Sequence, residues 1–187
     1  MRKLAVLALL FFALSCKRSE TAVKPDSKPA ATTTATATST AHQPSGTDIG
    51  AMMPEYSASW LDGSKFEVAS LRNKVVLLNL WATWCGPCRT EIPELQMIHQ
   101  KYAARGFEVV GVSVDETGPE AVKEFVDQQK VTYPIALDPE GKLASIFQTS
   151  VLPTSVLIDR NGRIVWKKYE QILPNDKALL AAIEKSL

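Results

Sequence analysis

The chain has 187 residues, 45% of them hydrophobic, and a formal net charge of +1. This length and composition are typical of one ordinary domain with some additional chain. Because the charge is balanced and the folded part has no basic cluster longer than a dipeptide, nothing indicates a nucleic-acid partner, and function must be read from particular residues.

Residues 1–15 have the layout of an export signal. Arg2 and Lys3 precede an apolar run of about eleven residues, whereas a helix that crosses the hydrocarbon core needs about 20. We therefore expect cleavage rather than a permanent transmembrane anchor. The "ALSC" that ends at Cys16 resembles the bacterial lipobox, although Ala13 replaces the commoner leucine. The resemblance implies that Cys16 is a lipid anchor; the alternative is an ordinary secretory signal with an unmodified cysteine.

Residues 16–50 are dominated by Thr, Ala, Ser and Pro and lack an apolar period that could bury a face. We expect a lipid-anchored disordered tether that lets the domain move over a wide volume above its membrane. The globular domain is expected to span residues 51–187, which are enough for one hydrophobic core.

The first half of this domain predicts a strand, a helix and a second strand. Near its start, two short strand-like pieces flank the turn at Asp62-Gly63. "KVVLLNLWA" and "GFEVVGVSVD" are near-continuous apolar runs, as strands buried on both faces require. Between them, from Cys85 to Arg105, apolar residues recur at helical spacing and predict one buried stripe. The stripe consists of Ile92, Leu95, Ile98 and Tyr102. This order predicts a parallel crossover.

The second half alternates helical and strand-like segments. "GPEAVKEFVDQQK" predicts a helix, "YPIALD" a short strand, and residues 143–147 a small helix. "SVLIDRNGRIVWKKY" predicts two antiparallel strands joined around Asn161-Gly162, the strongest short hairpin signal. "PNDKALLAAIEKSL" predicts a terminal helix. The domain is therefore expected to be an α/β fold, with a mixed central sheet flanked by helices on both faces.

The stretch "WATWCGPCRTEIP" holds Cys85 and Cys88 two residues apart. A zinc site would need two further Cys or His ligands. Cys16 and His42 lie outside the domain and His99 lies far along the helix, so we expect neither a metal nor a cofactor. A structural disulfide across so short a loop would stabilise little. The spacing suits a dithiol that cycles, in which one sulfur attacks a partner and the second resolves the mixed disulfide.

The two cysteines are expected to have different roles. Cys85 would lie at the helix N-terminus, where unpaired N–H groups and the helix dipole favour a thiolate. Cys88 lies a turn deeper. We therefore expect Cys85 to be the exposed nucleophile and Cys88 the buried resolving thiol.

The motif "WCGPC" after a buried strand, followed by a helix with Pro93 five residues beyond the second cysteine, resembles thioredoxin. "VLPTSVLID" is similar to the segment that carries a cis-proline facing the dithiol in thioredoxins, which implies a cis Leu152-Pro153 bond beside an extended substrate. The resemblance implies site-shaping and substrate-binding roles for Trp84, Gly86, Pro87, Leu152 and Pro153. It covers nearly all of residues 52–187 and implies a thioredoxin-like sheet with an N-terminal hairpin and a central inserted helix-strand.

Within that superfamily the chain is most similar to the TlpA/ResA type of membrane-anchored thiol-disulfide oxidoreductase. The similar segments are "VVLLNLWATWCGPCRTEIPEL", "PEAVKEFVDQQKVTYPIALD" and "DRNGRIV". Asn79 stands where thioredoxin has a buried Asp, and it cannot serve as a base. Glu91, three residues past Cys88 and on its helix face, aligns with an acidic residue that ResA-like members place by the dithiol. The resemblance implies proton transfer or thiol tuning by Glu91; a solvated or capping carboxylate is the alternative.

The resemblance implies an exported lipoprotein that faces the periplasm or the cell exterior and uses Cys85 and Cys88 to reduce disulfides of partner proteins. That space is oxidising, so a reductant there must be recharged through the membrane, which suggests a DsbD- or CcdA-like membrane electron donor. The implied substrates are cysteines in cytochrome c maturation or in copper-site assembly, and we expect a monomer.

Two other functions stay open. A Cu(I)-binding dithiol module is conceivable because soft thiolates suit that ion, although no Met or His stands near the pair. A peroxidase of the peroxiredoxin branch shares the fold, but it would need a lone peroxidatic cysteine in a Pro, Thr and Cys setting.

Overall fold

A computed structural model describes residues 46–187. The expected signal peptide, the lipid anchor at Cys16 and most of the expected tether lie outside these residues. Among the described residues, no helix is both long and apolar enough to cross a membrane.

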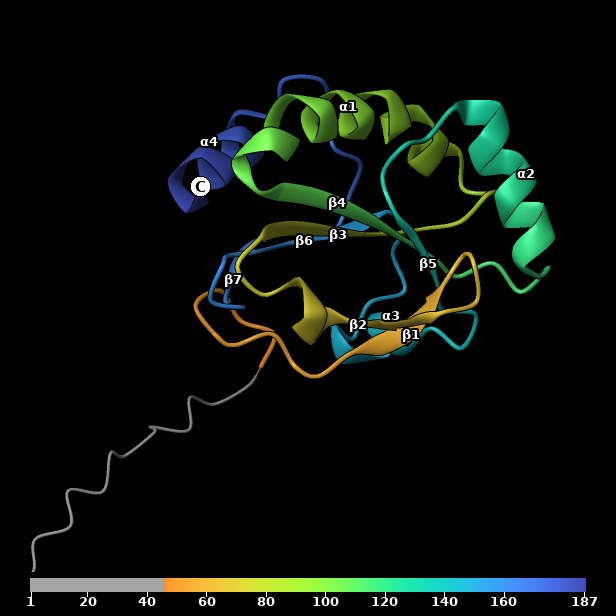
Figure 1. The fold of residues 1–187 in the computed structure, drawn as a ribbon, viewed down its shortest axis with the longest axis horizontal. Coiled ribbons are helices and arrows are strands. Elements are labelled where there is room, and N and C mark those ends of the chain that lie inside the picture. The colour runs from red at the N-terminus through yellow and green to blue at the C-terminus, as the bar shows by residue number, and fades with distance from the viewer. Residues whose placement is uncertain (1–45) are drawn as a thin grey trace, which may run out of the picture. The chain divides into compact units, whose positions relative to one another are not determined.

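A seven-stranded mixed sheet forms the centre of the domain (Figure 1), in the spatial order β2-β1-β5-β4-β3-β6-β7. The strands are β1 (Ser57–Trp60), β2 (Lys65–Glu67), β3 (Val75–Trp81), β4 (Phe107–Ser113), β5 (Ile135–Leu137), β6 (Thr154–Ile158) and β7 (Ile164–Lys168). The neighbours β3, β4 and β5 run parallel, and every other pairing is antiparallel. This is the mixed sheet that the sequence predicts, with the N-terminal hairpin β1–β2 at one edge.

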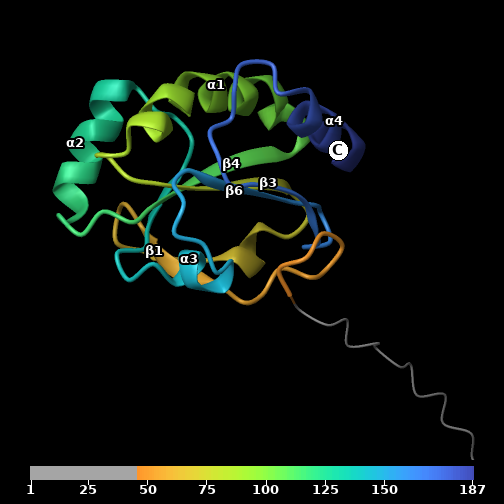
Figure 2. The ribbon, with the colours of Figure 1, turned by 180° about the vertical axis from the view of Figure 1, so that it is seen from behind.

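Four α-helices and two 3₁₀ turns connect the strands. They are α1 (Gly86–Tyr102), α2 (Pro119–Gln129), α3 (Lys142–Ile146), α4 (Lys177–Ser186), η1 (Val68–Leu71) and η2 (Ala103–Arg105). Figure 1 shows α1, α2 and α4 on one face of the sheet and α3 on the other, and the opposite view in Figure 2 shows the same layers. The prediction of helices on both faces is confirmed.

Strand β3 separates two hydrophobic clusters. Successive side chains of a strand point to opposite faces, so Leu77 and Trp81 pack under α1, whereas Leu78 and Leu80 pack on the α3 side. All seven residues of the strand are buried, because elements cover both faces and neighbouring strands pair with both edges. By this alternation Asn79, the one amide in the strand, faces α1.

Helix α1 confirms the predicted stripe, since all four of its apolar residues are buried. Pro87 lies in the first turn, where no intrahelical bond to its nitrogen is needed. The helix ends at Tyr102 rather than at Arg105, because residues 103–105 form η2 and Gly106 turns the chain with a φ of 86°.

The strands β6 and β7 form the predicted hairpin, with a register shift between Leu157 and Ile158. Two residues that precede the expected start of the domain are hydrogen-bonded to β7. Gly50 N donates to Ile164 O at 2.7 Å, and Lys167 Nζ donates to Thr47 O at 2.5 Å. Contacts with the domain therefore begin before residue 51.

Candidate active site

Cys85 and Cys88 lie at the start of α1 and are joined as a disulfide, with a Cα–Cα distance of 5.3 Å. Cys85 is the N-cap residue of the helix, in extended conformation, and its sulfur accepts a hydrogen bond from Cys88 N at 3.3 Å. The Cys85 sulfur thus lies where the unpaired N–H groups and the dipole of the helix favour negative charge. This is the position that the sequence predicts for the pair.

The expectation that Cys85 is exposed is wrong for this disulfide-bonded form. Cys85 is only 5% exposed and Cys88 is 1% exposed, and both belong to the hydrophobic cluster under α1. The bond to Cys88 holds the Cys85 sulfur against the first turn of the helix, so little of it reaches solvent. The expected order is retained, since Cys85 is the more exposed of the two.

The Leu152-Pro153 peptide bond is cis, as the resemblance implies. Strand β6 begins at the next residue and runs antiparallel to β3, with Thr154 opposite Leu80. The start of β6 therefore lies at the end of β3 that leads to the dithiol. Sheet pairing in this way brings the proline segment to the dithiol's end of the domain from far along the chain.

Trp84 projects from the surface next to the dithiol and is 69% exposed. Together with Leu152 it lines a groove of about 310 Å³, whose walls include Leu80 and Val151 and whose charged residues include Glu116. Figure 1 places the groove's elements, the ends of β3 and β4 and the turn before α3, at one end of the sheet. Trp84 joins this groove to the dithiol, and the mixture of apolar and polar side chains along it suits an extended protein segment.

Glu91 is buried, with 1% of its surface exposed, and both of its oxygens accept hydrogen bonds. Asn79 Nδ2 donates to Oε1 and Ile172 N donates to Oε2, each at 2.7 Å. The alternative of a solvated or capping carboxylate is therefore wrong. Burial raises the pKa of Glu91 to about 7, although the hydrogen bonds from Ile172 and Asn79 and the charge of Lys168 act in the opposite direction.

Ser155 completes a polar group that reasoning from the sequence missed. It lies directly opposite Asn79 in the β3–β6 pairing, and its hydroxyl accepts the second N–H of that amide at 3.0 Å. Both side chains are buried. The available signal was a serine inside the buried run "TSVLI", since buried polar groups require partners.

Asp115 holds the loop that leads to the dithiol, and it too was missed. Its buried carboxylate accepts hydrogen bonds from Thr83 N at 2.9 Å, from the Thr83 hydroxyl at 2.5 Å and from the Ser113 hydroxyl at 2.7 Å. Because β3 and β4 are parallel, the residues that follow them meet at one edge of the sheet. The signal in the sequence was the aspartate that ends the apolar run "GFEVVGVSVD".

No group of three His, Cys, Asp or Glu side chains within residues 46–187 is arranged as metal ligands would be. His99, set aside as a ligand because it lies far along the helix, accepts a hydrogen bond at Nδ1 from Val109 N at 3.4 Å.

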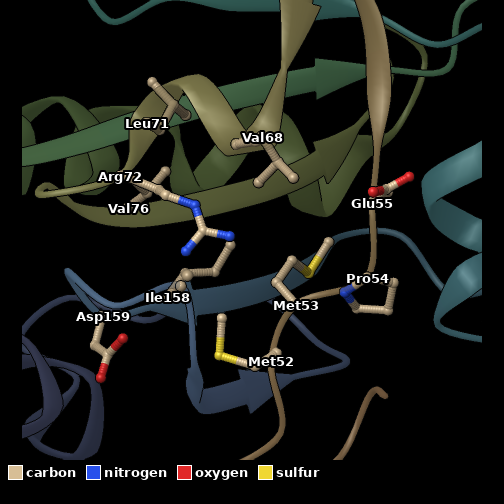
Figure 3. Close-up of a pocket in the computed structure, with 12 residues that line it drawn as sticks. Met52, Met53, Pro54, Glu55, Val68, Leu71, Arg72, Val76, Ile158 and Asp159 are labelled. Atoms are coloured by element: carbon tan, nitrogen blue, oxygen red, sulfur yellow. The ribbon is translucent and has the colours of Figure 1, made fainter. Parts of the chain in front are cut away.

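A separate cavity of about 100 Å³ lies at the other end of β3. Figure 3 shows Val68 and Leu71 on one side of it, Met52 and Met53 on the other, and the Arg72 side chain between the two sides. Val76 is at the start of β3, whereas the dithiol follows the strand's end. The cavity is therefore not part of the candidate active site.

Comparison with known sequences places this geometry in context. Residues 49–167 match the AhpC/TSA family. The chain is 40% identical over 119 residues to the thiol-disulfide oxidoreductase ResA of Bacillus cereus, an alignment that covers 64% of this chain and 68% of that protein. It is 33% identical over 116 residues to ResA of Geobacillus thermodenitrificans, covering 62% and 66% respectively.

Solved structures give the same result. A crystal structure described as a thiol:disulfide interchange protein DsbE, from Chlorobium tepidum, aligns with a TM-score of 0.68 and 31% identity over 74% of this chain and 97% of that one. A secreted thiol-disulfide isomerase from Corynebacterium glutamicum aligns with a TM-score of 0.65 and 28% identity, over 71% of this chain and 83% of its own.

Proposed function

The chain belongs to the AhpC/TSA family of thioredoxin-like proteins, and we propose on this premise that it reduces disulfide bonds of partner proteins outside the cytoplasm. Its relatives are named thiol-disulfide oxidoreductases, and it is an enzyme of that class. The observation that carries the proposal is the Cys85–Cys88 disulfide at the N-terminus of α1.

The proposed reaction uses the two sulfurs in sequence. In the reduced enzyme the Cys85 thiolate attacks one sulfur of the partner's disulfide; that bond breaks and the partner's other sulfur leaves as a thiolate. The Cys88 thiolate then attacks Cys85 in the mixed disulfide, forms the Cys85–Cys88 bond and releases the second partner thiolate. Two electrons pass from the enzyme to the partner, and the two thiolates of the partner take up protons.

Glu91 is the proposed acceptor of the Cys88 proton. It lies three residues further along α1, on the same helix face, and both side chains are buried away from water. A base inside the domain is needed because Cys88 attacks as a thiolate while solvent is excluded. With a pKa of about 7, Glu91 can take and return a proton at neutral pH.

Trp84, Leu152 and Pro153 are the proposed contacts of the partner segment. Trp84 and Leu152 form walls of the groove next to the dithiol. Gly86, at the start of α1, has open space where a side chain would be, which suits close approach of a partner's backbone. Pro87 is proposed to shape the first turn of the helix.

The location and the direction of the reaction are proposals as well. Residues 1–16 support export and attachment by a lipid at Cys16, and the relative from Corynebacterium glutamicum is described as secreted. In an oxidising space, a reductase requires electrons from across the membrane. We propose a DsbD- or CcdA-like donor, and partner cysteines in cytochrome c maturation or copper-site assembly.

Trapping of the mixed disulfide tests the mechanism. Cys88→Ser in the full chain should leave Cys85 covalently attached to its partners in cells, because the resolving sulfur is absent. The doubly substituted Cys85→Ser, Cys88→Ser chain is the control. If the two variants captured the same proteins, or none, the exchange mechanism would be wrong.

The reduction potential tests the direction. We expect a value of about −200 mV or lower, as for reducing thiol enzymes, and a value near about −120 mV would contradict the reductase assignment. Two further assays address the alternatives: hydrogen peroxide consumption that needs only Cys85 would favour the peroxidase, and tight Cu(I) binding without disulfide exchange would favour the copper module.

A further inference from the structure

Asn79, Glu91 and Ser155 form a buried polar chain that crosses three elements. Asn79 is in β3, Glu91 in α1 and Ser155 in β6, and each is almost fully removed from solvent. Through Asn79, these contacts link the helix that carries the dithiol to the strand that follows the cis Leu152-Pro153 bond.

The orientation of the Asn79 amide is determined by its bond to the Glu91 carboxylate, which accepts hydrogen bonds when ionised. One N–H donates to Glu91 Oε1 at 2.7 Å and the other to Ser155 Oγ at 3.0 Å. A side-chain amide has only two N–H donors, so both are used. Rotation that exchanged the amide oxygen and nitrogen would place an oxygen against the Glu91 carboxylate and would break that contact, whereas the Ser155 hydroxyl could then donate to the amide oxygen.

The Glu91 carboxylate is held on the other side by the backbone. Ile172, in the loop between β7 and α4, donates its N–H to Oε2 at 2.7 Å. One oxygen is therefore positioned by the sheet and the other by the loop. This two-sided contact determines the direction of the carboxylate relative to α1, which also carries Cys88.

We propose that Asn79, supported by Ser155, is a positioning residue for thiol-disulfide exchange, which holds the Glu91 carboxylate in the orientation that accepts the Cys88 proton. The proposal rests on the proposed function of Glu91. It assigns a role to the asparagine that replaces the buried acid of thioredoxin: the amide is a donor to a base on the neighbouring helix instead of a base itself.

Other charged or titratable groups also face Glu91. Lys168 of β7 lowers the pKa of Glu91 through its charge, but Lys168 is itself paired with Asp176 at 2.7 Å. Tyr133 lies nearby, and burial, followed by the charge of Glu91, raises the pKa of that phenol. Cys88 shares the helix. Of these neighbours, only Asn79 bonds the carboxylate through a side chain.

Loss of the Asn79 bond should move the ionisation of Glu91 to higher pH, because a hydrogen bond to a carboxylate favours its charged form. A bond of this kind corresponds to a shift of about one pH unit or more. From a starting pKa of about 7, one unit would lower the ionised fraction at pH 7 from about one half to about one tenth. The exchange rate at pH 7 should then fall by about fivefold and recover at higher pH.

The test is the pH dependence of disulfide reduction by the pre-reduced full chain, with a small aromatic disulfide as substrate, in the wild type, Asn79→Leu and Ser155→Ala. We expect the inflection of the rate against pH to move up by about one pH unit in Asn79→Leu. In Ser155→Ala, which removes only the hydroxyl that supports the amide, it should move by less. The ¹³C signal of the Glu91 carboxyl should titrate with the same shifts.

Glu94→Gln is the matched control. Glu94 is a second buried glutamate on α1 that accepts a backbone N–H from the same loop, from Asn175 at 3.1 Å. Its substitution should leave the inflection unchanged. If Asn79→Leu does not fold, the pH dependence of Ser155→Ala still tests the proposal.

The outcomes are distinguishable. An unchanged inflection in both variants, or an equal loss of rate at every pH, would overturn the positioning role. If the wild type showed no exchange at any pH, the proposed function would fail instead, while the carboxyl titration would still report whether Asn79 controls Glu91.

Discussion

The two faces of the central sheet are built from the same strands but bury different chemistry. On the α3 face, the central strands contribute mainly apolar side chains, and the one buried polar side chain of β6 on this face, Thr154, donates to Val151 O in the turn before the strand. The apolar side chains are Val76, Leu78, Leu80, Val110, Val112, Val156 and Ile158. On the α1 face, the same strands contribute Asn79 and Ser155, which face the buried Glu91. The α3 face is mainly a hydrophobic core, whereas the α1 face, which also carries the dithiol, includes a chain of hydrogen-bonded polar side chains.

This difference supports the proposal that the chemistry belongs to the α1 face. Removing a carboxylate from water is costly even when it is hydrogen-bonded. The polar chain is therefore poorly explained by stability alone. We expect substitutions on the α3 face to alter stability without altering exchange, and substitutions on the α1 face to alter exchange, its pH dependence or both.

Cys85→Ser should have the largest effect. It removes the attacking sulfur, so reduction of a protein disulfide such as that of insulin should fall below detection. Stability should change little, because the cross-link closes a very short loop. The measurement is turnover with a chemical reductant as electron source. Residual turnover comparable to the wild type would show that Cys85 is not the nucleophile.

Leu78→Ala tests the opposite face at the residue next to Asn79. Leu78 is fully buried in the α3-side cluster, and its truncation should cost about 3–5 kcal/mol of unfolding free energy. Urea denaturation measures this loss. The folded fraction should keep the pH dependence of exchange of the wild type, and a shifted inflection would mean that the two faces are not separable.

Glu91→Gln should change how stability depends on pH. The pKa of Glu91 is raised from 4.5 to about 7 in the folded state, so the folded chain binds more protons between these values. The stability that protonation of Glu91 contributes is fully present below pH 4.5 and is lost as the pH rises to 7. The loss amounts to about 3 kcal/mol.

The comparison between wild type and Glu91→Gln isolates this contribution. Over that range the wild type should lose stability relative to the variant, as measured by denaturation at a series of pH values. Glu94→Gln should retain the wild-type slope. Parallel curves for the wild type and Glu91→Gln would mean that Glu91 titrates normally despite its burial.

Trp84→Ala should have the smallest effect on the folded domain, since this side chain is on the surface and belongs to neither buried cluster. We expect a stability change within about 0.5 kcal/mol. The KM for a protein disulfide should rise, whereas the rate with a small disulfide should be unchanged. Equal effects on both substrates would place Trp84 in the chemical step rather than in partner binding.

Most of the fold could be predicted from local patterns. The buried strands β3 and β4, the apolar stripe of α1 and the turn at Asn161-Gly162 each follow from periodicity or turn chemistry within a few residues. The dithiol and the cis-proline could also be located, because their motifs are short and specific.

The surroundings of the dithiol could not be predicted in the same way. Glu91 occurs in the first turns of a helix, where carboxylates are usually solvated, and its two donors come from residues 79 and 172. The contact of Asp115 with Thr83 likewise depends on the parallel pairing of β3 and β4. The exposure of Cys85 was predicted wrongly, because helix position alone does not show how the disulfide packs.

The sequence by itself determined the elements, their order and the pair of sulfurs, because these depend on neighbours along the chain. Only the tertiary structure decided what surrounds "WCGPC": a buried carboxylate, an amide that faces it from β3 and a hydroxyl from β6. The physical reason is that burial and hydrogen-bond partners arise from residues distant in sequence, and these determine whether an acid ionises near pH 4.5 or near 7.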